Sequence, residues 1–148
     1  MEKKFHNKRR TDGSYERKPS AGHGLMAYKK EPENKFNGRV YVIIGPVTYS
    51  GGSEFCNMMY TNDLATFVGQ ETGGGYFGNT SGYSQELLLP NSKIEIDIPA
   101  LQFMMNVKPK LPFGSVVKPD HKVVPTYEEY VNCENASQKY ILEILEQK

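Results

Sequence analysis

The chain has 148 residues, a formal net charge of +1 and two cysteines. This length and a mid-range apolar content predict one modest domain rather than two. No stretch approaches the roughly 18 apolar residues of a membrane span, and no apolar run follows the basic start MEKKFHNKRR as it would in a signal peptide. We therefore expect no membrane span. The two cysteines lack the spacing of a disulfide framework or a zinc site, so we also expect no metal.

Charge is distributed unevenly along the chain. Residues 1–38 carry ten Lys and Arg against five Asp and Glu, whereas residues 39–148 carry eight against twelve. A basic segment could contact nucleic acid. However, the run NKRRTDGSYERKPSAGHG lacks interleaved aromatic residues and strong periodicity, which favours a loosely structured segment. We expect such a segment over 1–38, a domain over 39–148 and no nucleic-acid partner.

The first regular elements are predicted after the basic segment. Residues 39–45, RVYVIIG, are β-branched, aromatic and nearly continuously apolar, which predicts a strand covered on both faces. In the next segment Phe55, Met58 and Met59 stand at i, i+3 and i+4, the spacing of an apolar stripe on a helix. Cys56 is expected to be a small buried apolar residue. A buried strand followed by a helix favours a layered α/β domain.

The remaining elements are a strand, a hairpin and a helix. LATFVGQ (64–70) predicts a second short strand, and QELLLPNSKIEIDIPA predicts a hairpin whose alternating isoleucines form one apolar face. ENASQKYILEILEQK predicts a C-terminal amphipathic helix. The residues expected on or near its buried side are Ala136, Tyr140, Ile141, Ile144 and Leu145. The order β, α, β, β-hairpin, α is that of a mixed α/β fold.

The stretch TYSGG places Ser50 in the turn between the first strand and the first helix. A serine becomes a nucleophile when a base accepts its proton and amide groups stabilise the oxyanion. Gly51 and Gly52 permit unusual backbone conformations, and the first N–H groups of a helix point toward negative charge. Serine is also a common N-cap residue, and the full GxSxG pattern is absent because Thr48 occupies its first position. The nucleophile and cap interpretations both stay open on pattern alone.

A longer resemblance favours the nucleophile. FNGRVYVIIGPVTYSGGSEFCNMMYTNDLATFVGQETGGG, then LPNSKIEIDIP and VVKPDHKVVPTYEEY, resemble the second half of the catalytic domain of serine peptidase family 41. This family comprises the C-terminal processing or tail-specific proteases and a tricorn-core-like branch. The family typically shows, in this order, F-x-G-x-V-Y-V-L, T-[FY]-S-[AS]-[AG], A-T-x-[VI]-G-E-x-T-G-G, L-P-N-S and a late G-V-x-P-D, and the resemblance follows that order over about residues 36–130. The resemblance implies Ser50 as nucleophile and the Gly51 amide as an oxyanion donor.

The same resemblance implies a Clp-protease/crotonase-like fold of ββα layers, here as a partial domain. It implies a peptide or protein substrate and neither a metal nor an organic cofactor. Because family members commonly work outside the bacterial cytoplasm, it also implies the cell envelope or another extracytoplasmic location, although the chain carries no export signal.

The base expected for such a nucleophile is not found at the matching positions. The lysine of the processing branch corresponds to Gly75, and the late glutamate of the tricorn-like branch falls near Ser115. The histidine of that branch lies upstream of the matching region. Within the chain, His121, expected in a turn after Pro119-Asp120, and His23 are the candidate substitutes, though a lone histidine is more often a surface or packed residue. We expect the base to come from a missing upstream half or from a homo-oligomer.

The glycine-rich loop TGGGYFG has three possible roles. Gly73, Gly74 and Gly75 could let a substrate backbone lie close to Ser50, as strand addition requires, or they could form a simple flexible turn. A phosphate cradle is disfavoured because GxxxxGK[ST] is absent. For Glu71 two roles stay open: orienting this loop, or acid–base work.

The first helical turn contains Glu54, which is expected to be a solvated or helix-dipole carboxylate.

The function expected for the whole chain is peptide-bond hydrolysis through an acyl-enzyme on Ser50. The alternative is a catalytically inactive remnant that binds peptides or assembles with other subunits.

Overall fold

The computed structural model describes residues 7–17 and 33–147, so the candidate base His23 lies outside the described residues. The chain divides into two units, Met1–Asn37 and Gly38–Lys148. In the first unit, strands β1 (Asn7–Arg9) and β2 (Tyr15–Arg17) pair as an antiparallel hairpin. Its turn is closed by the Arg10 N–H, which donates to the Ser14 carbonyl over 2.8 Å. The basic segment therefore contains local secondary structure that the sequence pattern did not predict.

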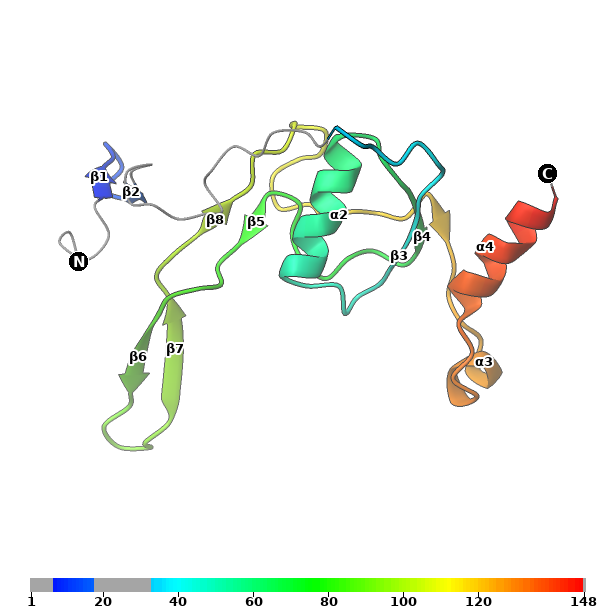
Figure 1. The fold of residues 1–148 in the computed structure, drawn as a ribbon. Helices are drawn as coiled ribbons and strands as arrows, with labels where there is room; N and C mark the ends of the chain where they lie inside the picture. Colours follow the sequence, from blue (N-terminus) through cyan, green and yellow to red (C-terminus); the bar gives the residue numbers. More distant parts are fainter. Residues whose placement is uncertain (1–6, 18–32, 148) are drawn as a thin grey trace. The chain divides into compact units, whose positions relative to one another are not determined.

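The second unit is a mixed α/β unit, as expected (Figure 1). Its core element is a parallel sheet with the order β3-β4-β9, beside which β5–β8 and β6–β7 form two antiparallel pairs. The elements are β3 (Tyr41–Ile44), α2 (Gly51–Thr61), β4 (Thr66–Gly69), β5 (Gly78–Asn79), β6 (Ser84–Leu88), β7 (Glu95–Pro99), β8 (Phe103–Met104), β9 (His121–Lys122), α3 (Tyr127–Val131) and α4 (Ala136–Glu146).

Helix α2 covers one face of the parallel sheet. Val42 pairs with Phe67, and neighbouring residues of paired strands share a face, so Val42, Ile44 and Phe67 point to the same side. Phe67 and Ile44 lie in the buried core cluster with Cys56 of α2. The Tyr60 ring of α2 lies 6.1 Å from the Phe67 ring, measured between centroids. The expected burial of Cys56 is confirmed.

Helix α4 covers part of the opposite face. It contacts β3 and β4, and Figure 1 shows α2 and α4 on opposite sides of these strands. Val68 on this face is fully buried, whereas Ile43 beside it keeps 44% of its surface exposed. The expectation that residues 39–45 are covered on both faces is therefore wrong for Ile43, because α4 does not extend over the whole face.

The buried face of α2 differs from the predicted apolar stripe. Phe55 and Met58 are exposed. The side chains that α2 buries are Ser53, Cys56, Asn57 and Thr61. The prediction of the stripe was therefore wrong for Phe55 and Met58, whereas Met59 is partly buried against the core. Ser53 and the Asn57 amide face the glycine-rich loop instead, where small and polar side chains fit.

The predicted hairpin and C-terminal helix are both present. β6 and β7 pair with Leu87 opposite Ile96 and Gln85 opposite Ile98, so the expected apolar face forms. This face is exposed rather than packed: Ile96 and Ile98 keep 39% and 47% of their surface accessible. On α4, Tyr140 is half-buried and Leu145 is exposed, so the expected buried side is only partly covered. None of the helices within 7–17 and 33–147 is long and apolar enough to cross a membrane.

The revised face of α2 predicts the stability of two matched variants. Phe67→Ala removes a ring that is 1% exposed and should lower the free energy of unfolding by about 3–5 kcal/mol. Phe55→Ala removes a ring that is 53% exposed and should cost less than about 1 kcal/mol. Urea denaturation followed by circular dichroism measures both. A larger loss of unfolding free energy for Phe55→Ala than for Phe67→Ala would show that Phe55 is buried, as the sequence pattern predicted.

Candidate active site

Ser50 has a backbone conformation that serine rarely adopts. It joins the loop after β3 to α2 with φ 48° and ψ −125°. A non-glycine residue in such a conformation costs on the order of 1–3 kcal/mol, and residues of this kind cluster at functional sites. An N-cap residue instead has extended φ and ψ and a side chain that accepts a helical N–H bond. Ser50 makes no such side-chain bond, so it lacks the geometry of the cap alternative.

Backbone hydrogen bonds close the turn around Ser50. The Thr48 hydroxyl accepts from the Gly45 N–H over 3.1 Å, and the Thr48 N–H donates to the Gly45 carbonyl over 2.9 Å. The Tyr49 carbonyl then accepts from the N–H groups of Gly52 and Ser53, at 2.9 and 3.3 Å. The turn is therefore held by its own residues on both sides of Ser50.

Two polar groups of this turn have no hydrogen-bond partner within the described ranges. The Ser50 hydroxyl and the Gly51 N–H form no hydrogen bond to any described residue, and both residues are exposed. They lie at the N-terminus of α2, where the helix dipole favours negative charge. A hydroxyl next to a free N–H at a positive helix end has the arrangement that acyl transfer needs for a nucleophile and an oxyanion donor.

The glycine-rich loop packs directly on the Ser50 turn. The Gly74 N–H donates to the Thr48 carbonyl over 3.0 Å. A Cβ added at Gly74 would overlap the Ser53 hydroxyl, and one added at Gly73 would overlap the Pro46 carbonyl. These glycines thus permit close packing between two parts of the protein itself. Contact between them and a substrate stays a prediction.

The outer part of this loop is anchored to buried groups. Thr72 and Val117 exchange two hydrogen bonds: the Thr72 N–H donates to the Val117 carbonyl over 3.0 Å, and the Val117 N–H donates to the Thr72 hydroxyl over 3.1 Å. The Asn57 amide of α2 donates to the Gly75 carbonyl over 2.9 Å. The loop is therefore held in place rather than forming a simple flexible turn.

The candidate base His121 is not brought to Ser50. It begins β9 rather than lying in a turn, and it pairs with Val68 on the sheet face opposite α2. There its Nδ1 lies 3.0 Å from the Tyr140 hydroxyl of α4. A base for Ser50 is therefore not identified among residues 7–17 and 33–147.

The two candidate carboxylates have other partners. Glu54 accepts a hydrogen bond from the Asn79 amide over 2.8 Å, which connects β5 to the first turn of α2. Glu71 forms an exposed ion pair with Lys118 at 3.7 Å. Neither carboxylate is bonded to Ser50. The sequence pattern did not identify Asn79, because no motif distinguishes this asparagine from others in polar loops.

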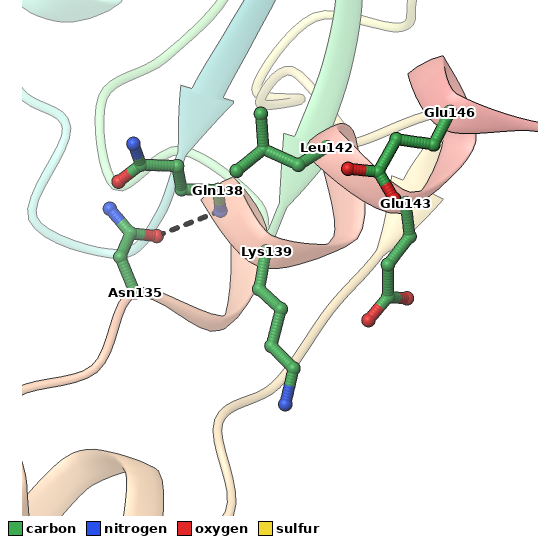
Figure 2. A pocket seen from close by; sticks show the side chains of 6 residues that line it. All are labelled: Asn135, Gln138, Lys139, Leu142, Glu143 and Glu146. Atoms are coloured by element: carbon green, nitrogen blue, oxygen red, sulfur yellow. Dashed lines mark hydrogen bonds between the residues drawn. The ribbon is translucent and has the colours of Figure 1, made fainter.

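A shallow surface depression lies on α4, away from this turn (Figure 2). The residues that line it are Asn135, Gln138, Lys139, Leu142, Glu143 and Glu146. Figure 2 shows the Asn135 side chain accepting the Gln138 N–H bond, at 3.0 Å, which is an ordinary N-cap. No cluster of His, Cys, Asp or Glu in the described part of the chain could hold a metal ion.

The space around Gly74 and Gly51 predicts different results for Gly→Ala variants at these two positions. Gly74→Ala should lower the free energy of unfolding by about 1–3 kcal/mol, because the new methyl group overlaps Ser53. Gly51→Ala meets open space at the start of a helix and should stay within about 1 kcal/mol of the wild type. Thermal and urea denaturation measure both variants. Equal losses would contradict the packing described here.

The two cysteines should differ in reactivity. Burial raises the pKa of the Cys56 thiol, whereas Cys133 is exposed. The thiolate is the reactive form of cysteine. At pH 8 only a small fraction of Cys56 should be thiolate, and the reagent should reach it poorly because the side chain is buried. We expect one fast thiol in the native chain and two in urea, read with a chromogenic disulfide and peptide mapping. Fast labelling of Cys56 in the native chain would show that its side chain is not buried between α2 and the core.

The chain is similar to known proteins in sequence and in fold. The sequence profile of the family described as Peptidase family S41 matches residues 2–123. No curated protein matches the sequence. Among solved structures, a protein from Parabacteroides merdae classed as a candidate peptidase is similar with a TM-score of 0.51. The identity is 23%, over 75% of this chain and 33% of that chain, so this likeness concerns the fold and the chain spans about a third of that protein's length. Since the profile covers most of its residues, the chain belongs to peptidase family S41.

Proposed function

We propose that the chain supplies the nucleophile part of a serine peptidase site, with Ser50 as nucleophile and the Gly51 N–H as oxyanion donor. The observation that carries this proposal is the conformation of Ser50, φ 48° and ψ −125°, with its hydroxyl free of any cap bond. A conformation that costs free energy is retained where the surrounding structure enforces it, and here it leaves the hydroxyl exposed at a helix N-terminus. Membership of the family supports the assignment.

The chemistry that follows is acyl transfer. The Ser50 oxygen attacks the carbonyl carbon of a peptide, its proton passes to a base, and the carbonyl oxygen becomes an oxyanion facing the Gly51 N–H. The C–N bond then breaks, and the amine leaves with that proton. Water hydrolyses the resulting ester and restores the serine hydroxyl. We place the base outside residues 7–17 and 33–147.

The fold and substrate class of the proposal follow the family. We assign the parallel sheet, with α2 on one face and α4 on the other, to a Clp/crotonase-like layering of C-terminal processing or tail-specific type. The substrate is a peptide or protein. A substrate strand would lie beside the loop that contains Gly73, Gly74 and Gly75.

A second candidate function is peptide binding or assembly without turnover. The observation that favours it is that the Ser50 hydroxyl has no described base as a partner. In this case the same turn would bind a peptide, and the hydroxyl would stay a weak nucleophile.

Labelling with a fluorophosphonate distinguishes the two functions. An activated Ser50 should displace fluoride and form one phosphonyl ester, found by intact mass and peptide mapping, and Ser50→Ala should abolish it. The matched control is Ser115→Ala, a serine outside the turn. A folded sample without adduct would show that no base reaches Ser50 in this chain; it would contradict turnover by the chain itself and favour the binding role.

A further inference from the structure

Ser53 is a buried hydroxyl next to the proposed oxyanion donor. It lies in the first turn of α2 and keeps 2% of its surface exposed. Its hydroxyl donates to the Ser50 carbonyl over 2.9 Å, and the Glu54 N–H donates to the same carbonyl over 2.9 Å. The Ser50 carbonyl therefore accepts two hydrogen bonds. One is the ordinary helical bond from a backbone N–H, and the other comes from a side-chain hydroxyl.

Holding this carbonyl also orients the next N–H group. The Ser50 carbonyl and the Gly51 N–H belong to one planar trans peptide group and point in opposite directions. Gly51 has no side chain, and a Cβ built there would meet nothing within 4 Å, so its own packing does not limit rotation of this peptide. The hydrogen bonds at the carbonyl therefore decide where the Gly51 N–H points.

The Ser53 side chain is itself held in place. Its oxygen and Cβ lie so close to Gly74 that a methyl group at Gly74 would overlap both. The glycine loop thus restricts the rotamer of Ser53, and Ser53 in turn restricts the peptide between Ser50 and Gly51. A hydrogen bond accepted by the carbonyl also polarises the peptide group and makes its N–H a stronger donor.

We propose that Ser53 is a positioning residue whose hydroxyl, bonded to the Ser50 carbonyl, aims the Gly51 N–H at the oxyanion. The orientation of the N–H does not depend on the proposed peptidase function, whereas its catalytic consequence rests on that function. The experiment therefore needs one readout for each part.

The first readout is the Gly51 amide resonance of the chain labelled with ¹⁵N-glycine. Ser53→Ala removes the hydroxyl, and Ser53→Cys keeps its shape but donates weakly. Both should shift or broaden the Gly51 resonance. Thr61→Val is the matched control, because it deletes a buried hydroxyl of the same helix that accepts from the Lys108 N–H over 2.7 Å. It should leave the Gly51 resonance in place. An unchanged Gly51 resonance in folded Ser53→Ala and Ser53→Cys would overturn the proposal.

The second readout is the rate of fluorophosphonate labelling. Ser53→Ala should lower the maximal labelling rate about 10–100-fold, less than the loss of a whole oxyanion donor, while the probe concentration at half-maximal rate stays within about twofold. Equal losses in Ser53→Ala and Thr61→Val would indicate a structural role alone and overturn the proposal, as would an unchanged rate in Ser53→Ala. If the wild type is not labelled, turnover by this chain fails, and the amide resonance still tests the orientation of the Gly51 N–H.

Discussion

The close approach of the glycine loop to the Ser50 turn is the contact on which the site depends. β3 and β4 are parallel, so the turns that follow them emerge at the same edge of the sheet. The Gly74 N–H bonds to the Thr48 carbonyl, and neither Gly73 nor Gly74 leaves room for a side chain at this contact. Since packed protein interiors do not deform continuously, the two turns hold each other in a single arrangement.

This arrangement explains how Ser50 keeps an unfavourable conformation. A positive φ at serine costs on the order of 1–3 kcal/mol, which local backbone bonds alone do not recover. Helix α2 is fixed by the core cluster that includes Cys56 and Phe67. The Asn57 amide and the Gly75 carbonyl connect that helix to the loop from a fully buried position. The strain at one residue is thus offset by packing spread over a helix, a loop and a sheet.

The sequence predicts the elements of this unit better than their faces. The strand ending at Ile44, the hairpin and α4 follow from hydrophobic patterns and turn residues, as the structure confirms. β9 was missed because two residues after Pro119 give no periodicity. The buried face of α2 was missed because Ser53 and Asn57 are polar, and their burial depends on partners distant in the chain. The φ of Ser50 was beyond any pattern, since serine rarely has a positive value.

The conformation of the Ser50 turn does not depend on contact with a base. The direct contacts of the Ser50 turn come from residues between Gly45 and Gly75, a continuous segment of loop, helix, strand and loop, and the hydrogen bonds between Thr72 and Val117 anchor the end of that segment. None of these contacts involves a base. The geometry of a nucleophile and its oxyanion donor can therefore form before a base is present, because it is set by backbone hydrogen bonds and glycine packing. What a base adds is proton transfer, and that requires only correct placement against a turn that is already formed.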